Sequence, residues 1–154
     1  MTLSKVSVSL PFHLGSAEWK PDEVERRAAW QLYVELVTRV ATQEMVVGDG
    51  LDEEVMESLY DLFIATRRIL RSAGPKAGVA HDSVGGIAVA VLNRGLRPFL
   101  SKWHAKLTSW SRESRTSSTW PDHAEFREAL SHLTTELDRY AEILAVIAGV
   151  GKDL

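Results

Sequence analysis

Apolar residues recur at three- and four-residue steps through most of the chain, which is the pattern of amphipathic helices. The pattern predicts long helices over residues 21–47, 52–73, 83–112 and 121–148. Four such helices, joined by short or moderate connections, bury their apolar faces most simply as an antiparallel up-down bundle. The sequence therefore predicts an all-α fold built on a four-helix bundle.

The first residues of the chain follow a different period. Residues 3–10 alternate between apolar and polar side chains, which is typical of an extended strand. Because a lone strand leaves backbone groups unpaired, we expect it to lie against the helices or to pair with another chain; a partly ordered arm is the alternative. We therefore divide the chain into an N-terminal extended arm, residues 1–20, and the bundle, residues 21–154.

The third predicted helix contains a proline inside its apolar pattern, Pro98. Proline removes one intrahelical hydrogen bond and collides with the preceding turn, which costs about 3 kcal/mol in a regular helix interior. We therefore expect the helix to be kinked or divided at Pro98, which changes the direction of Arg97. Near the start of the same helix, Gly85 and Gly86 permit close packing of a neighbouring segment, or the approach of a ligand to the backbone.

Composition narrows the classes of function. The chain has 154 residues, no cysteine and a formal charge of −3, so disulfides, thiolate metal sites and cysteine nucleophiles are excluded. Its mild acidity gives no overall attraction to DNA, RNA or anionic lipid, and no segment reaches the roughly 18 apolar residues of a membrane span. We expect a cytoplasmic protein with no membrane or DNA partner, and RNA binding only through a local basic patch.

Residues 96–110 form the most distinctive segment, LRPFLSKWHAKLTSW. Its large apolar side chains recur on one face of the predicted helix, which is how a buried seam is presented. Tryptophan is also favoured where proteins bind partners. We therefore consider Asn93, Trp103 and Trp110 as contacts for a partner helix or as the wall of a ligand pocket, with packing in the core as the alternative.

Arg97 and His104 lie beside that seam, with six residues between them. This spacing, in a helical bundle, resembles the Arg-x4-6-His signature of HEPN-domain ribonucleases. In that family the pair lies at a helical dimer interface, where histidine transfers protons and arginine stabilises phosphate charge. The resemblance implies metal-independent RNA cleavage by Arg97 and His104. The alternative is structural: Arg97 pairs with an acidic residue of a neighbouring helix, and His104 occupies a partly buried polar position.

Basic residues gather at two places in the sequence, around Arg67, Arg68 and Arg71 in the second helix and around Lys102 in the third. Such groups are usually solvated faces, but if the two met in space they would bind a phosphate-rich ligand. Neither paired Glu-x-x-His repeats nor a glycine-rich phosphate loop is present. We therefore expect no metal and no other cofactor.

The segment LRPFLSKWH also resembles part of small uncharacterised bacterial helical proteins, some of which are encoded near conflict or defence genes. This resemblance implies a domain that works within a larger assembly. From the sequence we expect a non-enzymatic module that binds itself or another protein. A HEPN-like ribonuclease and a bundle that binds a small ligand are the alternatives.

Overall fold

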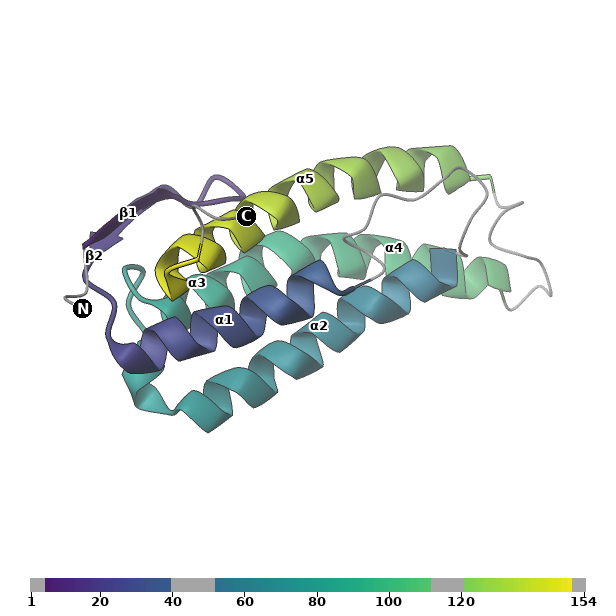
Figure 1. The fold of residues 1–154 in the computed structure, drawn as a ribbon. Helices are drawn as coiled ribbons and strands as arrows, with labels where there is room; N and C mark the ends of the chain where they lie inside the picture. Colours follow the sequence, from purple (N-terminus) through teal and green to yellow (C-terminus); the bar gives the residue numbers. More distant parts are fainter. Residues whose placement is uncertain (1–4, 40–51, 112–120, 151–154) are drawn as a thin grey trace.

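The protein is mostly helical, with one small two-stranded sheet. The computed structural model describes residues 5–39, 52–111 and 121–150. Within them lie β1 (Val6–Ser9), β2 (Ser16–Trp19), α1 (Glu23–Val37), α2 (Asp52–Ala73), α3 (Val84–Ala90), α4 (Arg97–Ser111) and α5 (His123–Ala148). Figure 1 shows the long helices lying alongside one another, with the two strands at one end. No helix in this described part is long and apolar enough to cross a membrane.

The helix boundaries agree with the sequence pattern except in the first helix. The range of α2 is the predicted one, and α5 begins two residues after the predicted start. The prediction that the first helix continues to residue 47 is wrong, because α1 ends at Val37. There the hydroxyl of Thr38 donates to the carbonyl of Val34 at 2.7 Å, a local bond that competes with further helical bonding. The predicted break at residues 48–50 lies outside the described residues.

The N-terminal strand has its partner in the same chain. β1 pairs antiparallel with β2, with Val6 opposite Trp19. The turn between them places Phe12 and His13 at φ 57° and 58°, a left-handed conformation that hairpins usually reserve for asparagine and glycine. The backbone N–H of Phe12 donates to a carboxylate oxygen of Glu136 on α5 at 3.0 Å, which holds the turn against the helices.

The hairpin and the helices share one hydrophobic core. Val8 and Leu10 of the hairpin are buried in it together with apolar residues of every long helix. α1 packs on both α2 and α5, and α2 also packs on α4. The residues expected to form a separate arm therefore contribute to the same core as the helices.

A buried carboxylate joins the hairpin, α1 and α3. One oxygen of Glu25 accepts from the indole N–H of Trp19 and from the backbone N–H of Val84, both at 3.0 Å. The other accepts from the backbone N–H of Asp22 in a capping box at the start of α1. Because every donor is neutral and supplied by the fold, Glu25 fixes these elements relative to one another.

The two glycines at the start of α3 lie against the connection that precedes it. A Cβ at Gly85 would lie 2.1 Å from the carbonyl oxygen of Gly78, and one at Gly86 would lie 1.8 Å from that of Ala80. Ser83 caps the same helix, since its hydroxyl accepts from the N–H of Gly86 at 3.0 Å. The predicted start of the third helix is confirmed, and its glycines serve close packing.

The third predicted helix is divided next to Pro98, as a proline there predicts. α3 and α4 are joined by the π-helix Val91–Leu96. At its end the N–H of Arg97 donates to the carbonyl of Leu92, five residues back. A proline lacks the N–H that a continuing α-helix needs, and the wider π-turn immediately before it gives its ring room.

Candidate functional site

The surface shared by α2 and α4 holds three of the residues that the sequence singled out, His104, Arg97 and Arg67. His104 is exposed on α4, and its ring meets Tyr60 of α2 edge to face with the centroids 5.3 Å apart. Both rings line a cavity of about 500 Å³, whose other walls are Glu53, Met56, Glu57, Leu107 and Thr108. The α2/α4 cavity therefore combines apolar side chains with a few polar groups, as do pockets that bind a small ligand or a side chain of a partner protein.

Arg97 lies on the same side of α4, about 10 Å before His104 along the helix axis. Its guanidinium lies over the ring of Phe63 of α2, 5.3 Å from the centroid. Nε and Nη2 both donate to the side-chain oxygen of Asn93, at 3.3 and 3.2 Å. The expected ion pair with an acidic residue does not occur in the described part of the chain. Arg97 is instead held by a ring and an amide.

Of the basic residues that the sequence singled out on the second helix, only Arg67 joins Arg97 at this ring. The guanidinium of Arg67 also lies over Phe63, 5.6 Å from the centroid. Arg71 is exposed one turn further along α2. Lys102 is placed elsewhere, over the ring of Trp103 at 4.8 Å and 3.7 Å from a carboxylate oxygen of Glu125.

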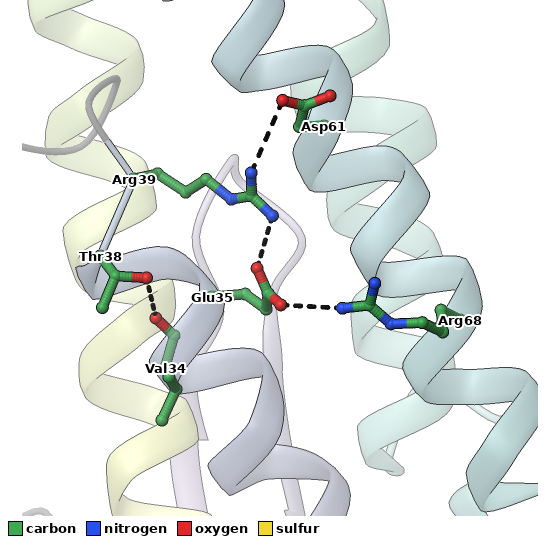
Figure 2. A network of polar contacts seen from close by, with 6 residues as sticks. All are labelled: Val34, Glu35, Thr38, Arg39, Asp61 and Arg68. Atoms are coloured by element: carbon green, nitrogen blue, oxygen red, sulfur yellow. Dashed lines mark hydrogen bonds and ion pairs between the residues drawn. The ribbon is translucent and has the colours of Figure 1, made fainter.

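Arg68 faces the other neighbour of α2. It donates to Glu35 of α1 at 3.0 Å, and Glu35 also binds Arg39. Arg39, two residues after the end of α1, lies 3.8 Å from Asp61, so the network in Figure 2 joins α2 both to α1 and to the residue that follows it. Each cation in it has an acidic partner. This network stabilises the α1/α2 contact, and Arg68 is not part of the α2/α4 surface.

The tryptophan seam of α4 belongs mainly to the core. Trp103 is 1% exposed and meets Phe126 of α5 edge to face, with the centroids 5.5 Å apart. Trp110 is partly buried and packs on the same core. Neither ring lines the α2/α4 cavity. Asn93 does not line it either, and it contacts this surface through its hydrogen bond with Arg97. Trp103 thus offers no surface to a partner.

One polar cluster was missed by sequence reasoning. Asp52 opens α2 with its carboxylate fully buried, 2.7 Å from Nδ1 of His123 and 2.8 Å from a terminal nitrogen of Arg127. The partners come from α5, 71 residues away in the case of His123, and no spacing in the sequence signals such a contact. A carboxylate at Nδ1 fixes the ring of a histidine, as in acid-base catalysis, but His123 does not line the α2/α4 cavity. The cluster joins the first turns of two helices.

The described residues contain no group of three or more histidine, cysteine, aspartate or glutamate side chains able to hold a metal ion. Burial raises the pKa of Tyr140, a residue of α5 that lies in the hydrophobic core. Partial burial, and then the nearby carboxylate of Glu142, raise the pKa of Asp138 above its usual 3.8. Both residues lie on α5, outside the α2/α4 surface.

Comparison of the chain with protein-family models, with curated proteins and with solved structures found no match. The interpretation of this site therefore depends on its geometry and chemistry.

Proposed function

We propose that the protein is a non-enzymatic helical module that binds protein, either a second copy of itself or another chain, through its α2/α4 surface. The observation that carries the proposal is the α2/α4 cavity, which lies beside large side chains left at the surface. Tyr60 is 38% exposed and Ile64, one turn further along α2, is 59% exposed. Exposed apolar side chains beside a pocket of this size are typical of binding surfaces.

The contact between Tyr60 and His104 supports this proposal. Two rings that already pack on one another lose little conformational freedom when a partner covers them, which favours binding. As the scaffold we propose an antiparallel up-down arrangement of four helices. Following the resemblance of LRPFLSKWH, we also propose a cytoplasmic location within a bacterial conflict or defence assembly.

Photo-crosslinking in the native host tests the proposal. Benzoylphenylalanine placed at Ile64 is expected to give a discrete protein adduct, whose mass identifies a second copy or another chain. The matched control is Val89 of α3, which is similarly exposed, at 47%, on another helix. Equal yields from the two positions, or no adduct from Ile64, would contradict binding through the α2/α4 surface.

A metal-independent ribonuclease is the second candidate. It is favoured by the exposure of Arg97 and His104 on one side of α4, with neither side chain paired to a carboxylate of the described residues. In a dimer, the arginine would stabilise phosphate charge and the histidine would transfer a proton. The His104→Ala variant should then lose RNA cleavage while folding normally. RNA breakdown by this variant at the wild-type rate excludes this candidate.

A small-ligand bundle is the third candidate, because about 500 Å³ is also the size of small-molecule pockets. The Thr108→Trp variant, which fills the α2/α4 cavity, distinguishes it. This candidate predicts that Thr108→Trp loses small-ligand binding and that the wild type gives no protein adduct from Ile64.

A further inference from the structure

We propose that Arg67 and Arg97, both held on Phe63, form a binding site for a carboxylate, and that the partner of the α2/α4 surface places an aspartate or glutamate there. The second half of this statement rests on the proposed function. The first half does not, because a carboxylate site can be tested with a small molecule.

The two guanidiniums are positioned before any ligand arrives. Phe63 is only 6% exposed, so its ring is fixed in the core, and the guanidiniums of Arg67 and Arg97 lie 5.6 and 5.3 Å from its centroid. Asn93 further restrains Arg97 by accepting from Nε and from one N–H of Nη2, which leaves Nη1 and the second N–H of Nη2 available to an anion. A planar guanidinium held in this way matches a carboxylate with two parallel hydrogen bonds.

No acid of the described residues balances these two charges. Neither Arg67 nor Arg97 has an acidic residue within four positions in the sequence, and residues 83–112 contain no aspartate or glutamate at all. The charged residues nearest to Arg67 and Arg97 in the sequence are Arg68, Arg71 and Arg94, which are also cations. An anion that binds between Arg67 and Arg97 therefore relieves a like-charge repulsion.

The charges elsewhere on α2 favour a single carboxylate over a nucleic acid. The first half of α2 carries Asp52, Glu53, Glu54, Glu57 and Asp61, and Glu53 and Glu57 line the α2/α4 cavity. A phosphate polymer that followed the surface from Arg97 toward the cavity would be repelled there. A protein segment with one acidic residue can instead place apolar side chains on Ile64, Tyr60 and the cavity.

The first experiment uses glutarate as the probe. In a titration of ¹⁵N-labelled protein at constant ionic strength, the side-chain Nε–Hε resonances of Arg67 and Arg97 should shift and saturate. The Nε–Hε resonance of Arg71, an exposed arginine of α2 that does not lie over Phe63, should not shift. Arg97→Gln should weaken the response of Arg67 about tenfold, and Arg71→Gln should leave it unchanged. Amide spectra that match the wild type show that each variant is folded.

Two results would overturn the carboxylate site. One is that glutarate shifts the resonances of Arg67 and Arg97 no more than sodium chloride does, or that it shifts Arg67 and Arg71 equally. The other is tighter, Arg97-dependent binding of poly(U) RNA, which would assign the two arginines to nucleic acid.

The role of the site in partner binding has its own readout. Crosslinking from Ile64 should fall about tenfold in Arg97→Gln and persist in Arg71→Gln. An undiminished adduct in Arg97→Gln, with glutarate binding intact in the wild type, would show that the partner does not use this site. If the wild type gives no adduct from Ile64, the proposed function is contradicted, but the carboxylate site is not.

Discussion

The hairpin end of the molecule and the α2/α4 surface treat their charged side chains in opposite ways. At the hairpin end, Glu25 is buried and the fold supplies its donors, from Trp19, Val84 and Asp22. On the α2/α4 surface, the guanidiniums of Arg67 and Arg97 are exposed and have no acidic acceptor among the described residues. A carboxylate whose donors are all internal contributes to stability, whereas exposed cations with no internal anion are available to a ligand.

The two regions also differ in how tightly they are packed. Around Gly85 and Gly86 the backbone approaches so closely that not even a methyl group fits. Between α2 and α4 the chain leaves about 500 Å³ empty, next to Tyr60 and His104. Under the proposed function, the hairpin end carries stability and the α2/α4 surface carries binding.

The largest effect is expected from Gly86→Ala. The added Cβ would meet the carbonyl oxygen of Ala80 at 1.8 Å, and backbone must move to relieve the clash. We expect a loss of about 3 kcal/mol in the free energy of unfolding, measured by urea denaturation. Gly74→Ala is the control: nothing lies within 4 Å of its Cβ, and only its backbone conformation, φ +77° and ψ −172°, costs energy, about 1–2 kcal/mol. Equal losses in the two variants would contradict tight packing at α3.

Glu25→Ala comes next. The substitution leaves the indole N–H of Trp19 and the backbone N–H of Val84 without their acceptor. We expect the free energy of unfolding to fall by about 2–3 kcal/mol. Glu23→Ala, the exposed acid of the same first turn, should cost about 0.5 kcal/mol. Similar costs for the two acids would show that Glu25 does not join the hairpin to α3.

Substitutions on the α2/α4 surface should affect stability less and binding more. Tyr60→Ala and His104→Ala each remove one edge-to-face ring contact, which contributes about 0.5–1 kcal/mol. Both variants should nevertheless lose most of the adduct formed from Ile64. A loss of several kcal/mol in urea denaturation, with full crosslinking, would make this surface a structural one.

The smallest effect is expected on α5, outside both regions. The pKa of Asp138 is raised by partial burial and by Glu142, so its ionised form is disfavoured in the folded protein. Asp138→Asn should therefore stabilise at neutral pH by about 0.2–0.5 kcal/mol, the size of a like-charge pair four residues apart. The gain should disappear as the pH falls toward 3.8, where the wild-type carboxyl binds its proton. A gain of the same size in acid and at neutral pH would contradict this cause.

Local signals in the sequence predicted the features that local chemistry decides. The range of α2, the cap at Ser83 and the interruption next to Pro98 each depend on residues a few positions apart. β2 was not predicted, because four residues carry little periodicity and two left-handed positions of the turn before it are Phe12 and His13, where asparagine or glycine is usual.

The contacts that define the candidate site depend on the packing of distant segments. Arg67 and Arg97 are 30 residues apart and share a ring only because α2 packs on α4. Asp52 and His123 meet across a separation of 71 residues. The sequence identified Arg97, His104 and Arg67 as candidates, but only the packing of the helices decides which of them lie together.

The π-helix Val91–Leu96 also sets how α4 is rotated about its own axis. A turn that contains one extra residue rotates everything after it by about 100° relative to an unbroken α-helix. The residues of α4 that face α2, Arg97 and His104 among them, therefore do so because of the length of this segment as well as their own identities. Deleting one residue there would rotate α4 as a whole and turn its buried Trp103 toward a different neighbour.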